Sequence, residues 1–151
     1  MRDQQGFTLV ELLVVFAILA LLVGAVPVAF ERMRDSAQYR DTLRSMLSDL
    51  KVARERAVTQ GQEVRFRIDL RNRTYGVHDQ AQRALPESLQ IKAVVASKEV
   101  RPDGVAAILF LPGGGATGGT VEVIRPSGGG TRLQVDWLTG RVTQETLSRS
   151  P

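Results

Sequence analysis

Few side chains in this sequence are suited to covalent or acid–base chemistry. His78 is the only histidine and there is no cysteine, which excludes disulfides, thiolate zinc sites and cysteine nucleophiles together. The sequence has no G-x-S-x-G motif and no metal-ligand spacing of His, Asp and Glu. We therefore expect no enzymatic activity, no metal and no cofactor, and we expect His78 to lie on the surface or edge of a hairpin strand.

Two other groups of residues are candidates for binding: a glycine-rich stretch and the arginines. The glycine-rich stretch Gly113–Gly119 lacks the lysine of a phosphate-binding loop, so a surface loop is expected, and whether it contacts a partner stays open. Seventeen of the twenty basic residues are arginine and the net charge is +4, a bias that suits phosphate and carboxylate groups. The arginines considered for binding are Arg65, Arg67, Arg71 and Arg73 around one predicted hairpin, and Arg141 and Arg149 near the C-terminus. Three explanations for these arginines remain open: they face solvent, they bind acidic protein partners, or they bind DNA.

The most informative carboxylate is Glu11, because it precedes a long apolar run. The nineteen residues Leu12–Phe30 contain no charged side chain, and as a helix they would span about 30 Å, the thickness of a bilayer's hydrocarbon core. A cleavable secretory signal would need a small-x-small site after the run, and the sequence around Pro27 does not supply one. Glu11 is either an interfacial side chain that reaches water or a carboxylate that binds a cation after assembly.

The residues Gly6-Phe7-Thr8-Leu9-Val10-Glu11, followed at once by the apolar run, closely resemble the class III signal of type IV pilins and type II secretion pseudopilins. The resemblance implies that residues 1–6 are a leader peptide. A prepilin peptidase would cut between Gly6 and Phe7 and methylate the new amino terminus at Phe7.

The same resemblance implies a role for Glu11 in subunit assembly. Cleavage creates a cationic amine at Phe7, and the Glu11 carboxylate of a neighbouring subunit can neutralise it inside a packed helix bundle. Gly24 and Pro27 complete the segment. Because Pro27 cannot donate a hydrogen bond, we expect the helix to kink or loosen there.

Beyond the apolar run, the sequence predicts one continuous helix and then a set of short strands. Apolar residues at three- and four-residue spacing from Leu43 to Val58 extend the helix from about Phe7 to Gln60, and Gly61 is its expected C-terminal cap. After Gly61 the period changes to two. The predicted strands are Val64–Asp69, Thr74–Val77, Leu89–Ala96, Ala106–Leu111, Thr120–Ile124, Leu133–Trp137 and Arg141–Thr146. Gly- and Pro-rich turns between them favour antiparallel sheets and an α+β fold.

These elements suggest four parts of the chain. They are a leader (1–6), a transmembrane or filament-core helix (7–30), the periplasmic half of the helix (31–60) and an antiparallel β domain (61–151). We expect Trp137 to pack in the core of the last part or at its edge, with a role as a partner anchor as the alternative.

The second half of the chain resembles the GspH/FimT group of minor pseudopilins. The motifs that carry this resemblance are Ala53-Arg54, Ala57 and Gly61 leading into Val64-Arg65-Phe66, then Phe110 before the glycine-rich loop and Thr120–Ile124, and finally Asp136, Thr139-Gly140 and Arg141-Val142. The resemblance implies a pilin-like fold in which the long helix packs on two antiparallel sheets.

Together the two resemblances imply a structural subunit of the type II secretion pseudopilus, at or near its tip, that helps export folded proteins across the outer membrane. Its implied partners are other major and minor pseudopilins, the prepilin peptidase and membrane lipid. The implied location is the bacterial inner membrane, with one pass and a periplasmic C-terminal domain. The alternative is a FimT-like minor pilin of a type IV pilus, whose arginines would bind DNA during uptake; nucleic acid is otherwise not an expected partner.

Overall fold

The computed structural model describes residues 8–95 and 104–148, and within the helix it leaves out the side chains of residues 23–32. The chain divides into two compact units, Met1–Ser36 and Ala37–Pro151. Helix α1 (Leu9–Gln60) contributes to both, so the predicted long helix is confirmed from Leu9 onward. Its predicted first residue, Phe7, lies outside the described residues.

Thr8 caps the amino-terminal end of α1. Its hydroxyl oxygen accepts the Glu11 amide at 3.3 Å, and its carbonyl accepts the Leu12 amide at 3.2 Å. A threonine in this position satisfies one of the backbone donors that the first helical turn leaves unpaired. The short polar side chain before the apolar run therefore determines where the helix begins.

In the second unit, α1 buries the stripe that its spacing predicts. Met46, Leu50, Ala53 and Ala57 are fully buried, and they recur at the three- and four-residue steps that keep side chains on one helix face. Val58 was predicted to belong to this stripe but is 48 % exposed. The reason is geometric: Val58 follows the buried Ala57 by one position and so points to a different side of the helix.

Gly61 ends the helix in the conformation expected of a C-cap. Its φ of 64° lies in the left-handed region that glycine adopts without steric cost. The chain then turns directly into the first strand.

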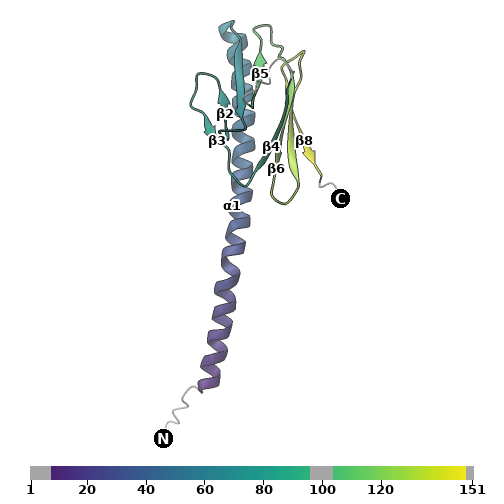
Figure 1. Ribbon diagram of the computed structural model, residues 1–151. Coiled ribbons are helices and arrows are strands. Elements are labelled where there is room, and N and C mark those ends of the chain that lie inside the picture. The colour runs from purple at the N-terminus through teal and green to yellow at the C-terminus, as the bar shows by residue number, and fades with distance from the viewer. Residues whose placement is uncertain (1–7, 96–103, 149–151) are drawn as a thin grey trace. The chain divides into compact units, whose positions relative to one another are not determined.

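The strands form two antiparallel sheets (Figure 1), each with four strands. The first sheet has the order β3-β2-β1-β5 and the second β4-β6-β7-β8. Their bounds are β1 (Val64–Asp69), β2 (Thr74–Val77), β3 (Arg83–Ala84), β4 (Gln90–Val95), β5 (Val105–Phe110), β6 (Gly119–Ile124), β7 (Gly130–Val135) and β8 (Val142–Leu147). The predicted α+β class with antiparallel sheets is confirmed. The two-residue strand β3 was missed, because a segment so short has no periodicity.

One core joins the helix to both sheets. Strand β1 shows the alternation clearly, since Phe66 and Ile68 are buried while Arg65, beside Phe66, is exposed. From the second sheet, Val121 and Leu133 enter the same buried cluster as Met46 of the helix. The apolar stripe of α1 thus packs on the inner faces of the two sheets, as the resemblance implied.

Candidate assembly and interaction sites

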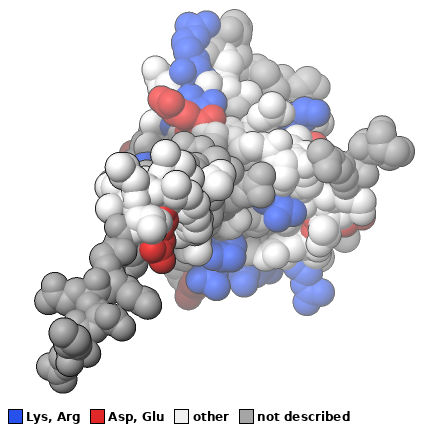
Figure 2. All heavy atoms as spheres, turned by 90° about the horizontal axis from the view of Figure 1, so that it is seen from below, with Lys and Arg blue, Asp and Glu red and all other residues white. Residues whose placement is uncertain are grey.

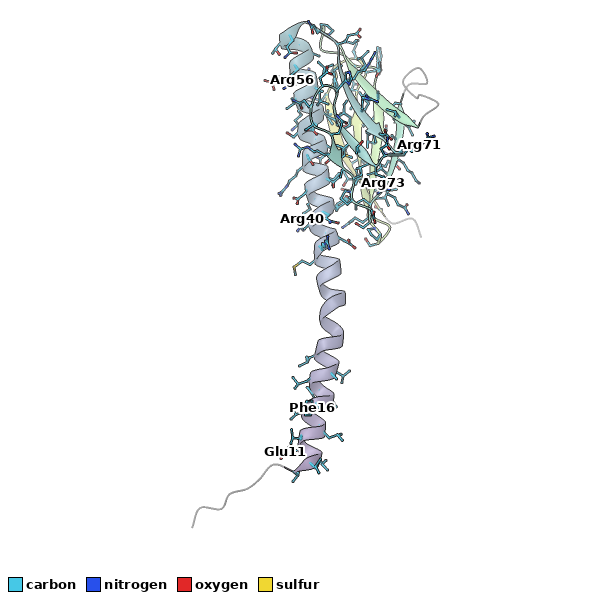
Figure 3. All side chains as sticks on the ribbon, turned by 60° about the vertical axis from the view of Figure 1, so that its left-hand side comes forward. Glu11, Phe16, Arg40, Arg56, Arg71 and Arg73 are labelled. Atoms are coloured by element: carbon cyan, nitrogen blue, oxygen red, sulfur yellow. The ribbon has the colours of Figure 1, made fainter. Side chains whose placement is uncertain are left out.

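The described amino-terminal part of α1 exposes apolar side chains on every side. All residues from Leu9 to Leu22 are exposed, and Phe16, labelled in Figure 3, keeps 65 % of its surface accessible. A helix that is apolar all round is typical of a segment buried by other molecules or by lipid. Among the described residues, no helix is long and apolar enough to cross a membrane. The predicted span Leu12–Phe30 includes residues 23–30, whose side chains lie outside the described ones.

Glu11 lies in the first turn of this apolar segment (Figure 3). An acidic side chain in the first turn interacts favourably with the amino-terminal end of the helix dipole. Within the described part of the chain, no cation forms an ion pair with its carboxylate. The other predicted residues of this site, Gly6 and Phe7, lie outside the described residues, as do the side chains of Gly24 and Pro27.

The predicted arginine cluster at the β1–β2 hairpin is present, but its members have different surroundings (Figure 3). Arg71 is exposed in the turn. Arg73, in contrast, donates through Nη2 to the carbonyls of Pro86 at 2.7 Å and Leu89 at 2.9 Å. It therefore ties the chain before β4 to the hairpin and is only partly exposed.

Near the carboxyl end of the helix, a polar cavity of about 300 Å³ collects charges of both signs. Arg56 and Arg65 line it together with Glu63, His78 and Asp79. His78 is exposed just after β2, as expected, with its Nε2 3.5 Å from an Asp79 oxygen. Among the described residues, no group of three or more His, Cys, Asp or Glu side chains could hold a metal ion. Mixed charge of this kind gives the cavity no clear preference for one ligand.

A row of charges that alternate in sign crosses the outer face of the second sheet. The strand register places Lys92 opposite Glu122, Glu122 opposite Arg132, and Arg132 opposite Glu145. Arg132 donates to Glu122 through Nη2 at 2.8 Å and Nε at 3.0 Å, and to Glu145 through Nη1 at 3.2 Å. The hydrogen bond to Glu122 is the main cause that raises the pKa of Arg132. The row is not visible in the sequence, because its members are paired only by strand register.

The β7–β8 turn presents two large apolar side chains to solvent. Trp137 is 68 % exposed and Leu138 66 %, so the prediction that Trp137 packs in the core or at its edge is wrong. β7 ends at Val135, and the turn is held by Asp136, whose side chain accepts the Thr139 amide at 2.8 Å and hydroxyl at 2.7 Å. These bonds lower the pKa of Asp136. They also hold the turn in place, and Trp137 therefore stays outside the core.

The glycine-rich loop packs against this turn rather than extending freely into solvent. The Ala116 amide donates to the Trp137 carbonyl at 2.9 Å, and a side chain at Gly115 would come within 3.1 Å of the same oxygen. Helix α1 also contacts the β7–β8 turn, since Arg54 Nε donates to the Thr139 carbonyl at 3.0 Å. The loop glycines allow this close approach, so a structural role accounts for them.

Of the two C-terminal arginines predicted as contacts, Arg141 is exposed directly after the turn and Arg149 lies outside the described residues. Figure 2 shows the basic side chains of the visible face in several separate groups rather than in one patch. In the second sheet, Arg132 is paired with two carboxylates, and these compensate its positive charge.

A helix with an apolar beginning, whose later turns pack on two antiparallel sheets, defines the pilin-like class of proteins. Residues 42–140 match the family model of the type II transport protein GspH, and residues 1–27 match that of the prokaryotic N-terminal methylation motif. The chain belongs to the GspH family.

Individual proteins agree with this assignment. The chain is 27 % identical over 150 residues to the type II secretion system protein H of Xanthomonas campestris pv. campestris, covering 99 % of this chain and 88 % of the relative. Its fold resembles that of the minor pseudopilin EpsH of Vibrio cholerae, with a TM-score of 0.54, 19 % identity, and coverage of 76 % of this chain and 99 % of EpsH. The type IV minor pilin FimU of Pseudomonas aeruginosa has a TM-score of 0.51 at 18 % identity, covering 76 % of this chain and 90 % of FimU. At these identities the two structures establish the fold alone.

Proposed function

We propose that this protein is a minor pseudopilin of the type II secretion system, a structural subunit at or near the pseudopilus tip that helps export folded proteins across the outer membrane. The observation that carries the proposal is the match of residues 42–140 to the GspH family. The long helix packed on two antiparallel sheets suits a subunit that acts by assembly with other pseudopilins.

The amino-terminal residues support processing and anchoring in the inner membrane. The match of residues 1–27 to the methylation motif includes Gly6 and Phe7, where the prepilin peptidase would cut and methylate. The uncharged run Leu12–Phe30 would anchor the chain in lipid with the C-terminal domain in the periplasm, and Gly24 with Pro27 would let the helix bend. After processing, Phe7 would be the first residue.

Glu11 would set the axial position of the subunit in the filament. The segment Leu9–Leu22 exposes apolar side chains all round, and apolar surfaces alone would let neighbouring helices slide past one another. A carboxylate in this segment requires a cation, and the methylated amine of Phe7 on a neighbouring subunit supplies one. Removing one partner of a buried charge pair costs about 3–5 kcal/mol, which lowers assembly by roughly a hundredfold or more.

The proposal can be tested by secretion assays in a strain that lacks the gene. Loss of the gene is expected to trap folded exoproteins in the periplasm, and the wild-type gene should restore their export. The Glu11→Leu variant should be inserted and cleaved but should fail to restore export. Glu87→Leu, which removes an exposed carboxylate outside the apolar segment, is the matched control and should restore it.

The two parts of the proposal fail in different ways. Undiminished secretion without the gene would refute the role in secretion. Wild-type secretion and crosslinking to neighbouring pseudopilins by Glu11→Leu would refute only the charge pair. The FimT-like alternative instead requires DNA binding by the arginines, which the paired state of Arg132 does not favour.

A further inference from the structure

Helix α1 and the β7–β8 turn expose large apolar side chains on either side of the glycine-rich loop. Trp137 and Leu138 of the turn are 68 % and 66 % exposed, and Val58 of the helix is 48 % exposed. The loop contacts both elements. Its Ala116 amide donates to the Trp137 carbonyl at 2.9 Å, and a Cβ at Gly114 would lie 4.0 Å from Val58 Cγ2. We call the exposed side chains of Val58, Trp137 and Leu138 the turn surface; exposed apolar groups that gather in this way are typical of interaction sites.

The backbone that carries the turn surface is already held in place. The Asp136 side chain accepts the Thr139 amide and hydroxyl, and the Gly140 amide donates to the Asp136 carbonyl at 2.9 Å. From the helix, Arg54 Nε donates to the Thr139 carbonyl at 3.0 Å. Binding would therefore order little additional backbone, which lowers its entropic cost. A tryptophan on such a support is the type of residue that most often dominates the energy of an interface.

Two guanidinium groups border the turn surface. Arg54 is exposed beside the loop, with its Nη2 3.9 Å from the position of a Cβ at Gly114, and Arg141 is exposed directly after the turn. In the part of the chain that the structure describes, neither arginine forms an ion pair. The carboxylate of the turn, Asp136, already accepts two hydrogen bonds from Thr139. A partner that complements this surface must therefore supply carboxylates of its own.

The turn surface belongs to the end of the second unit at which the helix finishes. Val58 is two residues before the last residue of α1, Gln60, and the second unit begins at Ala37. The 21 residues between Ala37 and Val58 span about 30 Å of helix. The chain enters this unit from its membrane anchor at Ala37, so we do not expect lipid to cover the turn surface.

We propose that the turn surface binds a different pseudopilin, which receives Trp137 in an apolar pocket and pairs carboxylates with Arg54 and Arg141. The inference rests on the proposed function, which brings other pseudopilins alongside this chain in one membrane. A second copy joined through the same surface would bring guanidinium groups together, and like charges within an interface are unfavourable. The complementary surface is therefore acidic and belongs to another subunit.

Photo-crosslinking in the full chain, in its own membrane, identifies the partner. The photoreactive residue p-benzoyl-phenylalanine replaces either Leu138 or Ser127, which lies exposed in the β6–β7 turn at the other end of the second sheet. We expect position 138 to give an adduct with another pseudopilin, recognised by mass spectrometry from its processed and methylated amino terminus, and position 127 to give only background. An adduct with a second copy or with an exported protein, or equal yields at the two positions, would overturn the proposal.

Truncation of the anchor is tested on the chain that carries the probe at position 138. Trp137→Ala should lower the adduct yield by at least about tenfold. Leu70→Ala truncates a side chain that is 41 % exposed in the β1–β2 turn and is the matched control that should retain the yield. Because Trp137 is exposed, Trp137→Ala should unfold at the same urea concentration as the wild type, which separates lost binding from lost folding. An undiminished yield would refute the role of Trp137.

A carbodiimide tests for the partner's carboxylates, because it condenses an amine with a carboxylate only where the two are in contact. Arg141→Lys places an amine at the edge of the turn surface and should give an adduct with the same pseudopilin. Arg71→Lys makes the same change in the exposed β1–β2 turn and should give no more adduct than the wild-type chain, whose own lysines set the background. A background yield with Arg141→Lys would refute the acidic partner.

Failure of this inference and failure of the proposed function give different results. Export that depends on the gene, together with only background adduct at position 138, would refute the turn surface and leave the role in secretion intact. An adduct with a subunit of a type IV pilus would refute both.

Discussion

The Gly140→Ala substitution is expected to destabilise the second unit by about 2–5 kcal/mol. Gly140 has a φ of 61°, and a residue with a Cβ in this left-handed conformation costs about 1–2 kcal/mol. An added Cβ would also lie 2.5 Å from the Gly114 carbonyl oxygen and 3.2 Å from Arg54 Nε. Crowding of this kind in a packed region costs about 1–3 kcal/mol more.

The turn has little freedom to relieve that contact. The Gly140 amide donates to the Asp136 carbonyl at 2.9 Å, and the Asp136 side chain holds Thr139. From the helix side, Arg54 Nε donates to the Thr139 carbonyl at 3.0 Å. A shift large enough to make room would break at least one of these bonds, so the cost cannot be avoided by a small displacement.

Urea unfolding of the unit Ala37–Pro151, which contains the buried core formed by the described residues, measures the effect. The control is Gly113→Ala in the same loop region, where an added Cβ meets nothing within 4 Å and φ is not left-handed; its free energy of unfolding should change by less than about 0.5 kcal/mol. A loss of about 3 kcal/mol would lower Tm by roughly 10 °C. Equal stability of the two variants would refute the close packing of turn, loop and helix.

Three further predictions concern processing, the exposed turn and DNA. Gly6→Val should leave a full-length precursor, because a side chain before the cut blocks the close approach of the peptidase; an intact mass that lacks Met1–Gly6 and carries a methyl group would contradict this. Trp137→Ala should change the free energy of unfolding by less than about 0.5 kcal/mol, whereas a buried tryptophan would cost about 3–5 kcal/mol; chemical denaturation distinguishes the two. Labelled duplex DNA should bind only weakly at about 150 mM salt, since scattered basic side chains contact few phosphates at once and salt weakens each such contact; micromolar binding that disappears in an Arg141→Ala/Arg149→Ala variant would favour the pilus alternative.

Local patterns were enough to predict most of the elements. The helix boundary at Gly61 follows from a glycine that adopts a left-handed conformation, and β1 follows from the alternation around Phe66 and Ile68. Both signals depend on residues within a few positions of one another, which a sequence displays directly. The same holds for the Gly6-Phe7 motif and the run after Glu11, which indicate the family through adjacent residues alone.

Other features depend on residues that only folding brings together. The sequence places Arg141 and Glu145 close to each other, but register pairs Glu145 with Arg132 and leaves Arg141 at an open edge. Trp137 was expected in the core because aromatic residues are usually buried, yet the turn held by Asp136 exposes it.

The sequence by itself determined the order of elements, the apolar amino-terminal segment with its processing motif, and the α+β class, because each rests on local spacing and composition. The tertiary structure alone decided which strand edge stays open and which charges are paired. Those outcomes depend on how distant strands align, and a shift of one residue in register would move every side chain to the opposite face.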